Sequence, residues 1–347
     1  MPEPRPESVL LFGSPSVERR VSVASAQFIT GFLDARLWFW TPDGAVIEVS
    51  KPELEAHADA FIVDFEPRGI ARWASLGTAL DTLAPEKTVV VIGAHGGDGE
   101  DGTLQALLEA RHLAFTGSGS RASARAFDKS QAIAVARQQG VRVPDARAIE
   151  GCPAEQARAA VSRAFEELGP LVLKAQAGGS SLLLEFVRTP ADFTKAIELL
   201  ATHGGISFRA EQIIVGREFT VGVIDRGGSP VALPCSEVVM HGDRDFDYDG
   251  KYLGAGSEEI TPAQIAPELH AQLHELALRL HGALGCEGYS RSDFIVDARG
   301  PCFLELNTLP GLSGQSFIPQ QLQAAEIDFD RFLDEQIVLA MGKRVRG

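Results

Sequence analysis

The stretch RSDFIVDARGPCFLELN, residues 291–307, decides how the last third of the chain folds. Both of its arms are rich in apolar, β-branched and aromatic residues, which favour β-strands. Between the arms, residues 298–300 form a short segment that contains glycine, as expected for the turn of a β-hairpin. The sequence therefore predicts a hairpin with a three-residue turn, in which Asp297 pairs with Pro301.

Four polar residues share one face of this predicted hairpin. In this register Asp293 lies opposite Glu305. Arg291 lies opposite Asn307, and because side chains alternate between the faces of a strand, all four point the same way. Opposed carboxylates about 5 Å apart repel each other, by roughly 4 kcal/mol at the effective dielectric of a protein surface. A solvated polar face would explain an isolated pair of acids. Phosphate-binding features upstream favour a divalent cation instead, because Mg²⁺ takes oxygen ligands and usually binds together with substrate phosphates.

Length and charge limit the classes of function. A chain of 347 residues is long enough for two or three domains with cores of their own. Its formal net charge of −15 argues against nucleic acid or an anionic membrane as the main partner. An anionic ligand would therefore be held locally, by a few lysines and backbone amides.

The cysteines and the N-terminus point to the cytoplasm. Cys152, Cys235, Cys286 and Cys302 have no CxxC spacing, so the sequence predicts four buried thiols, with neither a disulfide framework nor a zinc site. Residues 1–6 predict a short disordered tail and not a signal sequence, and no apolar run is long enough to span a bilayer.

Strands and helices alternate in the first third of the chain. Apolar strands at 8–12 and 88–92 are each followed by a glycine-containing turn and a helix, at 17–32 and 103–111. This order predicts a parallel α/β domain, assigned to residues 1–121, and such sheets bind ligands where the strands end.

Two further units follow, at 122–215 and 216–347. The second is predicted to hold a helix from 122 that ends at Gly140, and strands at 171–174 and 182–187, with a helix after Thr189 and Pro190. The third is predicted to hold strands at 219–224 and 231–234, a helix at 267–284 and the acidic hairpin.

Glycines and lysines at two strand ends suit the binding of phosphate or carboxylate groups. Residues 95–103 contain four glycines before a helix start, where backbone amides can approach an anion closely. Lys174 precedes a second glycine turn and can add a point charge to it. Lys129 is a further candidate, although an isolated lysine is usually only solvated. His95 alone would more often be structural.

Two other segments suggest a nucleotide site. Residues 211–218 can form a hinge strand that pairs with a purine edge, with Glu218 accepting from ribose hydroxyls; a plain linker explains them equally well. Residues 240–257 are rich in Asp and Gly and long for a connection, which favours a lid over a reactive site. Lys251 and Tyr252 lie within that segment.

In their order along the chain, these segments resemble the signatures of the ATP-grasp superfamily and, within it, the D-alanine–D-alanine ligases. The similar stretches are 13–22, 95–103 with 117–119 and 128–129, 247–252, and 291–293 with 305–311. The resemblance implies an α/β (α+β) ATP-grasp fold with three parts: an N-terminal Rossmann-like parallel α/β domain, a central small α+β lid domain and a C-terminal α+β domain. It also implies a homodimer.

The resemblance assigns roles to individual residues. The metal ligands for two Mg²⁺ ions, with Mn²⁺ as a substitute, would be Asp293, Glu305 and Asn307. The ATP contacts would be Lys129, Lys174 and Lys251 to phosphates, and Glu211, Ile214 and Glu218 to adenosine. The substrate contacts would be Glu18 to the ammonium of the first D-alanine, His95 to orient it, and Ser316 to the carboxylate of the second. The remaining catalytic groups would be Ser180 and Tyr252, in a triad with Glu18, and Arg291 and the Gly311 amide, as oxyanion donors.

The reaction implied is ATP-dependent ligation of two D-alanines through a D-alanyl phosphate, for peptidoglycan synthesis. The chain departs from the family pattern at Arg20, where a second glutamate is usual, at Ala175, at 182–184, and at Phe317, where leucine is more common. A dipeptide ligase with another second substrate, such as D-serine, D-lactate or a different amino acid, is therefore an alternative, although Tyr252 favours D-alanine over D-lactate. A non-catalytic nucleotide-binding homologue is a second alternative.

Overall fold

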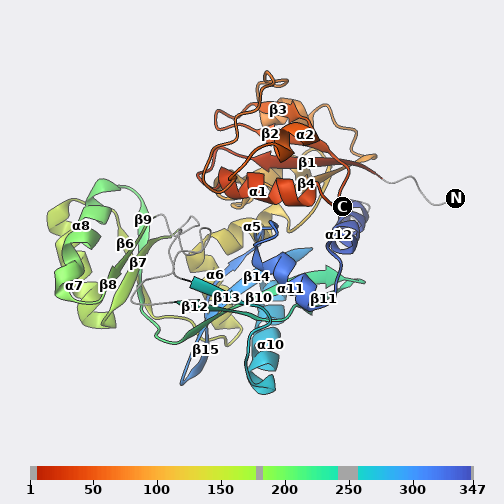
Figure 1. Cartoon of the computed structure of the whole chain (residues 1–347). Helices are drawn as coiled ribbons and strands as arrows, with labels where there is room; N and C mark the ends of the chain where they lie inside the picture. The colour runs from red at the N-terminus through yellow and green to blue at the C-terminus, as the bar shows by residue number, and fades with distance from the viewer. Residues whose placement is uncertain (1–5, 177–182, 241–256, 345–347) are drawn as a thin grey trace.

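The computed structural model describes residues 6–176, 183–240 and 257–344, and in these ranges the chain forms three β-sheets with helices packed on them (Figure 1). No helix within the described ranges is both long enough and apolar enough to cross a membrane.

The first sheet is made of strands that are buried and apolar on both faces, as is typical of parallel sheets. Its order is β3-β2-β1-β4-β5, with all pairs parallel except β3 with β2. Its elements are β1 (Glu7–Gly13), α1 (Arg19–Ile29), β2 (Arg36–Trp40), β3 (Val46–Val49), α2 (Lys51–Glu55), α3 (Leu76–Leu80), β4 (Thr88–Ile92), α4 (Thr103–Glu109) and β5 (Ala114–Phe115). The predicted parallel α/β unit is confirmed.

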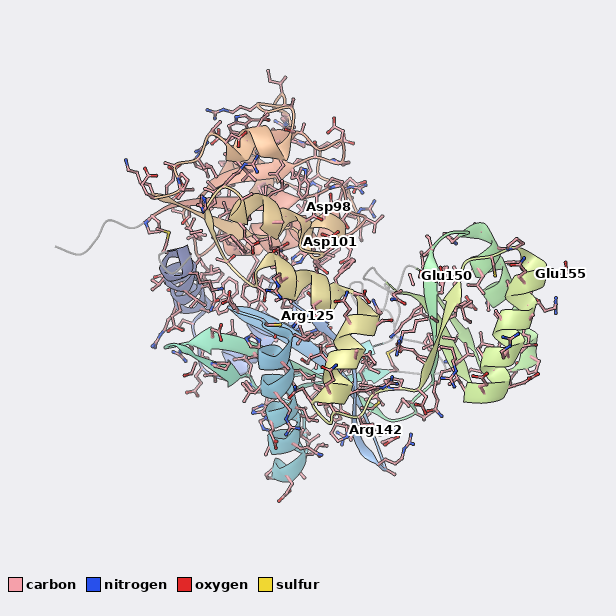
Figure 2. The ribbon with its side chains drawn as sticks, turned by 180° about the vertical axis from the view of Figure 1, so that it is seen from behind. Asp98, Asp101, Arg125, Arg142, Glu150 and Glu155 are labelled. Carbon is pink, nitrogen blue, oxygen red and sulfur yellow. The ribbon has the colours of Figure 1, made fainter. Side chains whose placement is uncertain are left out.

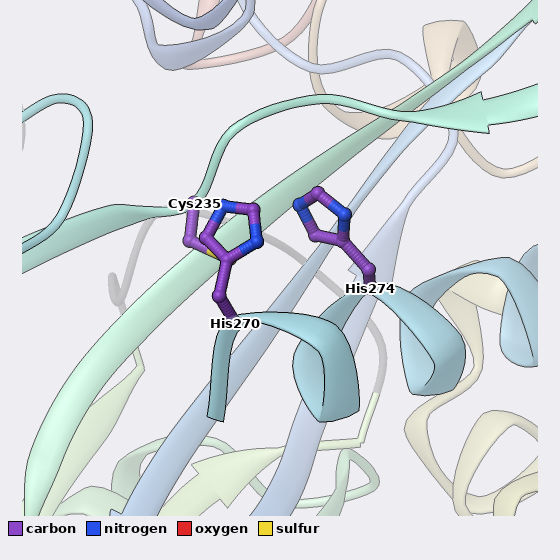
Figure 3. Close-up of side chains that lie close together, drawn as sticks. All are labelled: Cys235, His270 and His274. Atoms are coloured by element: carbon purple, nitrogen blue, oxygen red, sulfur yellow. The ribbon is translucent and has the colours of Figure 1, made fainter. Parts of the chain in front are cut away.

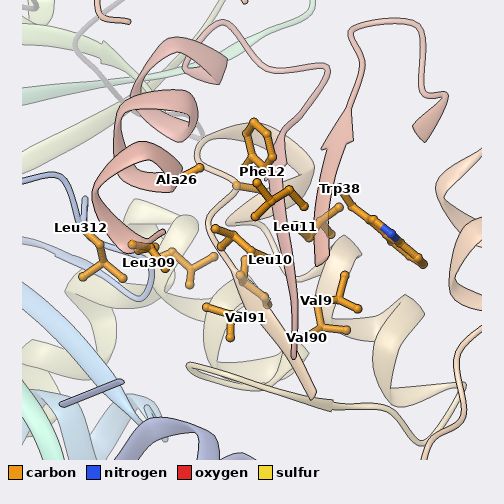
Figure 4. Close-up of a cluster of buried hydrophobic side chains, with 14 of the residues drawn as sticks. Val9, Leu10, Leu11, Phe12, Ala26, Trp38, Val90, Val91, Leu309 and Leu312 are labelled. Carbon is orange, nitrogen blue, oxygen red and sulfur yellow. The ribbon is translucent and has the colours of Figure 1, made fainter. Parts of the chain in front are cut away.

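The core of the first sheet also contains residues from the end of the chain. Leu309 and Leu312 belong to the same buried cluster as Leu10 and Ala26 (Figure 4). The last helix, α12 (Phe329–Arg344), packs against β4 and β5. The loop after the hairpin is thereby anchored to the first sheet, which brings the hairpin close to the carboxyl ends of β1 and β4.

The second sheet is antiparallel and has helices on its outer side (Figure 1). Its order is β6-β9-β7-β8. Its elements are β6 (Ala146–Glu150), α7 (Ala154–Leu168), β7 (Leu171–Ala175), β8 (Leu184–Val187), α8 (Phe193–Thr202) and β9 (Ser207–Gln212).

The third sheet separates a helical layer from a polar face. Its order is β13-β12-β10-β14-β15, with β11 paired to β10. Its strands are β10 (Arg217–Arg226), β11 (Ser229–Ala232), β12 (Ser236–Met240), β13 (Ser257–Ile260), β14 (Tyr289–Asp297) and β15 (Gly300–Asn307). Phe219 and Val221 of β10 share a buried cluster with α10 (Pro267–Leu284), whereas the alternate residues Glu218 and Thr220 line a cavity.

The hairpin of β14 and β15 has the predicted register at its functional end and a different one at its turn. Asp293 pairs with Glu305, as predicted, but Asp297 pairs with Gly300 and not with Pro301, so the turn has two residues. Asp297 Oδ1 accepts a hydrogen bond from the Arg299 amide across this turn, at 2.8 Å. A β-bulge after Asp293 adds one residue to β15, and this offset cancels the shorter turn.

The predicted helix from 122 to Gly140 is interrupted. It forms as α5 (Ser120–Phe127) and α6 (Lys129–Gln138), with the side chain of Asp128 accepting from the Ser130 and Gln131 amides at the start of α6. Both helices pack against β15, so they lie on the third sheet. The division of the chain at 121 and 215 remains a prediction.

The prediction of four buried thiols is wrong for Cys152. Cys235, Cys286 and Cys302 are buried and all four cysteines are free, but Cys152 is only half-buried because it lies in the connection between β6 and α7.

Candidate active site

A cavity of about 1210 Å³, including its open mouth, lies where the segments after β1 and β4 face the polar side of the third sheet. Ten of the predicted site residues line it: Glu18, His95, Lys129, Glu218, Arg291, Asp293, Glu305, Asn307, Gly311 and Ser316. Residues from both ends of the chain are thus brought together at one place, where the first sheet presents its strand ends.

The acidic pair of the hairpin is neutralised by cations of the chain itself. Arg291 donates from Nε to Asp293 Oδ1 and from Nη2 to Oδ2, each over 2.9 Å. The Nζ atom of Lys129, in the first turn of α6, lies 3.8 Å from Glu305 Oε2. Two basic side chains therefore already offset the repulsion between the two acids, and a bound metal at this face remains a prediction.

The same face nevertheless offers the ligand set that Mg²⁺ prefers. The carboxylates of Asp293 and Glu305 and the amide of Asn307 all reach the cavity. Asn307 Oδ1 accepts from the Leu309 amide at 2.7 Å, which fixes the side chain in place. A carboxylate has about four lone-pair sites, so Asp293 can bind Arg291 and a cation together.

His95 is buried and contacts both α1 and the loop after the hairpin. Its Nδ1 lies 3.0 Å from the Leu309 carbonyl, which can only accept, so Nδ1 carries the proton. Its Nε2 lies 3.0 Å from the Ser25 hydroxyl, and that hydroxyl accepts from the Leu312 amide. The His95 ring is therefore fixed by groups from α1 and from the loop after the hairpin.

Glu18 is buried at the start of α1, in a tight contact with the segment after β4. Gly96 has φ +71° and a Cβ there would lie 2.3 Å from Ser16 Oγ and 3.0 Å from Glu18, so only glycine allows this approach. Arg20, where the family pattern has an acid, donates from Nε to Asp64 Oδ1 at 2.9 Å. That hydrogen bond is the main cause that lowers the pKa of Asp64.

The three remaining described ATP candidates are Lys174, Glu211 and Ile214, and none of them is among the described residues that line the cavity; they lie on the second sheet or directly after it. Glu211 is buried, with Oε2 at 2.7 Å from Lys174 Nζ and Oε1 at 2.5 Å from Arg209 Nε. Ile214 is buried as well. The Lys129 amide donates to the Gln176 carbonyl at 3.2 Å, which links α6 to the end of β7.

Gly311 and Ser316 form one corner of the cavity. A Cβ on Gly311 would lie 2.6 Å from Ser316 Oγ, so glycine permits this close approach. Ser316 immediately precedes α11 (Phe317–Ala324), and its hydroxyl lies 2.8 Å from that of Ser313. The start of a helix favours a carboxylate. Phe317 extends from the same corner, with its ring centroid 5.7 Å from the guanidinium carbon of Arg291.

Ser180, Lys251 and Tyr252, which were predicted to be catalytic or to bind phosphate, lie outside the described residues, as do residues 241–256 of the lid predicted at 240–257.

Two further glutamates, which the sequence did not predict as site residues, also line the cavity. Glu100 is buried, with Oε1 3.8 Å from His95 Nδ1. Its neighbours Asp98 and Asp101, labelled in Figure 2, are not among the described residues that line the cavity: Asp98 is exposed, and Asp101 accepts from the Thr103 amide. Glu259 of β13 accepts from Gln320 Nε2 at 2.8 Å, and burial raises its pKa.

The three sheets, the cavity and the polar residues that line it define the class of protein, an ATP-grasp enzyme. Two family models match the chain: "D-ala D-ala ligase N-terminus" over residues 7–118 and "D-ala D-ala ligase C-terminus" over residues 135–338. The chain therefore belongs to the D-alanine–D-alanine ligase family.

Similar proteins and solved structures support this family assignment. A D-alanine–D-alanine ligase of Leptospira interrogans is 33% identical over 349 residues, which cover 96% of this chain and 97% of that protein. The Rhizobium meliloti enzyme of the same name is 36% identical over 264 residues, with 74% and 82% covered. Among solved structures, the D-alanine–D-alanine ligase of Coxiella burnetii has a TM-score of 0.80 at 25% identity, with 99% and 95% covered. The VanG D-Ala:D-Ser ligase of Enterococcus faecalis has a TM-score of 0.78 at 25% identity, with 97% and 100% covered.

Proposed function

We propose that the protein uses ATP to join two D-alanine molecules into D-alanyl-D-alanine, the dipeptide of peptidoglycan precursors, through a D-alanyl phosphate. One observation carries the proposal: groups suited to an amino acid, Glu18 and His95, line the same cavity as groups suited to phosphate and metal, Lys129 and the acidic hairpin. The carboxylate of an amino acid and the triphosphate of a nucleotide, if both were bound in this cavity, would lie close enough to react.

In the first step, a carboxylate oxygen of D-alanine attacks the γ-phosphorus of ATP, and the bond from that phosphorus to the bridging oxygen breaks to release ADP. Positioning and charge stabilisation supply most of the catalysis in such transfers. Glu18 would bind the substrate ammonium and His95 would orient the molecule. The proposed ATP contacts are Lys129, Lys174 and Lys251 for phosphates and Glu211, Ile214 and Glu218 for adenosine.

Asp293, Glu305 and Asn307 would hold two Mg²⁺ ions, or Mn²⁺ in their place, because their oxygen donors reach one cavity. When bound, these ions neutralise the charge of the phosphates.

In the second step, the amine of the second D-alanine attacks the acyl carbon, the carbon–oxygen bond to phosphate breaks, and the nitrogen loses a proton. The guanidinium of Arg291, which binds Asp293 through Nε and Nη2, would donate to the oxyanion together with the Gly311 amide. Ser316 would bind the carboxylate of the second substrate. Ser180 and Tyr252 would form the proposed triad with Glu18.

A substrate screen tests the proposal. Purified protein is supplied with ATP, Mg²⁺ and pairs drawn from D-amino acids, D-lactate and L-amino acids, and phosphate release and product mass are measured. D-Alanine alone should give one dipeptide and one phosphate per ATP consumed. ATP binding without phosphate release from any pair would instead identify a nucleotide-binding homologue that has lost turnover.

A second candidate is ligation of D-alanine to a different second substrate. The observation that favours it is Phe317, whose ring lies beside Arg291 and next to Ser316 in the corner proposed for the second carboxylate. The same screen separates the two candidates, because a mixed product with no D-alanyl-D-alanine would select the second.

The assembly and location are proposed on the resemblance to the family. We expect a homodimer, which light scattering of the purified chain would test, and a cytoplasmic location, where ATP is available.

A further inference from the structure

Two histidines and a cysteine meet on the third sheet, away from the candidate active site. One potential ligand atom each of Cys235, His270 and His274 lies within 4.8 Å of the others (Figure 3). Cys235 lies in the connection between β11 and β12, and the two histidines are one helical turn apart near the start of α10. None of the three is among the described residues that line the cavity, so the proposed ligase reaction does not use them.

The backbone holds the three residues in place. Cys235 is fully buried, and its carbonyl accepts from the Ala263 amide at 2.7 Å. Two residues earlier, the Leu233 amide donates to the Gly222 carbonyl of β10 at 2.8 Å. α10 packs against the same strand through a buried cluster that includes Leu273, next to His274, and Cys235 itself. The cluster is therefore built by tertiary packing and not by exposed side chains that happen to be close.

The hydrogen bonding of His274 is that of a metal ligand. Its Nε2 is buried and has no hydrogen-bond partner among the described residues. The backbone of Leu233 is a hydrogen-bonding neighbour of the same ring. A histidine that binds metal through one nitrogen typically donates from the other to a carbonyl or carboxylate.

We propose that Cys235, His270 and His274 bind a zinc ion. One sulfur and two imidazole nitrogens suit Zn²⁺, and the absence of oxygen ligands in this set excludes a Mg²⁺ site. Ligand atoms around tetrahedral Zn²⁺ are about 3.4–3.6 Å apart, given the usual bond lengths. The three side chains, at up to 4.8 Å, would therefore close on the ion by about 1 Å through small torsional changes. Water would take the fourth position.

A bound ion would connect the start of β12 to the first turns of α10. β12 carries Val238, which lines the candidate active site, so the ion would stabilise one wall of that cavity from the opposite face of the sheet. The effect expected is structural, because none of the three residues is among those described as lining the cavity.

Cobalt is the probe for the test, because a thiolate bound to Co²⁺ gives a charge-transfer absorption that oxygen ligands do not give. The full chain is freed of metal with a chelator, and Co²⁺ is titrated without nucleotide. We expect one ion per chain with thiolate absorption, displaced by an equimolar amount of Zn²⁺. Cys235→Ser should abolish the absorption, and His270→Gln should weaken binding at least about tenfold, the scale of disturbances to metal sites.

Matched controls are Cys302→Ser, a buried thiol on β15, and His203→Gln, at the end of α8. Both should bind cobalt as the unmodified chain does. The thermal midpoint of each metal-free variant shows that it folds, and if Cys235→Ser fails to fold, His270→Gln, at a half-buried position, decides the question. The proposal is overturned if the unmodified chain shows no thiolate absorption, or if that absorption survives Cys235→Ser or is unaffected by His270→Gln.

Discussion

Arg291 binds both carboxylate oxygens of Asp293, two residues away on the same strand, through hydrogen bonds of 2.9 Å from Nε and Nη2. Thr220 Oγ1 donates to the same carboxylate at 2.6 Å from the neighbouring strand. Arginine loses side-chain entropy when it is fixed, and here Asp293 fixes it with the guanidinium in the cavity. The proposed metal ligand is thus also the group that orients the proposed oxyanion donor.

Arg291→Met should lower turnover and leave ATP binding nearly unchanged. Methionine keeps an unbranched stem but removes every donor, and loss of one oxyanion donor lowers kcat by about 10²–10³-fold. Steady-state kcat and the KM for ATP measure the effect. Arg299→Met is the control, since Arg299 is an exposed arginine at the turn of the same hairpin. A raised KM for ATP with unchanged kcat would place Arg291 at the nucleotide and not at the oxyanion.

Glu305→Gln should raise the Mg²⁺ concentration needed for half-maximal activity by about tenfold or more, because the amide removes one negative charge from the proposed metal site. The measurement is a Mg²⁺ titration at saturating ATP. Glu258→Gln is the control, because Glu258 is exposed on β13 and is not among the described residues of the cavity. An unchanged titration for Glu305→Gln would remove this residue from the metal ligands.

Phe317→Leu should change the KM for the second amino acid by about two- to fivefold, the size of one exposed cation–π contact. Its ring lies 5.7 Å from the Arg291 guanidinium carbon, in the corner next to Ser316. The KM for ATP should stay within error. Competition between D-alanine and D-serine in one reaction, followed by product mass, shows whether the preference moves as well. Equal product ratios for both proteins would exclude Phe317 from acceptor choice.

Local sequence patterns predict the hairpin of the third sheet and the pairing of Asp293 with Glu305. The predicted three-residue turn, however, is wrong. Alternation along the two arms predicts which side chains share a face, and Asp293 does pair with Glu305. Turn length and bulges follow from single hydrogen bonds, such as that from the Arg299 amide to Asp297. Hydrophobic periodicity does not predict such bonds. The pairing of Asp293 with Glu305 agrees with the prediction because the turn is one residue shorter than predicted and the bulge adds one residue to β15.

Contacts between segments that lie far apart in the chain could not be predicted from the sequence. The inward turn of Glu100 follows from the short 3-10 turn at Gly97–Gly99, and the ion pair of Lys174 with Glu211 follows from strand pairing in the second sheet. The spacing of the cysteines does not predict the cluster of Cys235 with His270 and His274, because Cys235 lies far from the two histidines in the sequence. The signal present in the sequence was the spacing of His270 and His274, which puts both on one side of a helix.

The turn of the hairpin should make stability depend on pH below about 5. The hydrogen bonds from Arg142 lower the pKa of Asp297 below its ordinary value of 3.8. A carboxyl with a lowered pKa in the folded state contributes its full stabilisation above the unfolded pKa and loses it as pH falls through the folded pKa. Asp297→Asn should therefore unfold at lower urea than the unmodified chain at pH 7. The difference should shrink as pH falls from about 5 toward 2.

A double-mutant cycle with Arg142→Met isolates this pair from other titrating groups. Arg142 donates to both oxygens of Asp297, at 2.6 and 2.7 Å, and also to the Gly300 carbonyl at 3.0 Å, so its loss affects the turn twice. Only the interaction free energy between positions 142 and 297, obtained from the cycle, measures the contribution of the ion pair. Urea midpoints of the four proteins at pH 7, 5, 4 and 3 should give a coupling that is present at pH 7 and declines with acid. A coupling that stays constant over this range would show that packing of the side chains, and not ionisation of Asp297, joins the turn to the segment before β6.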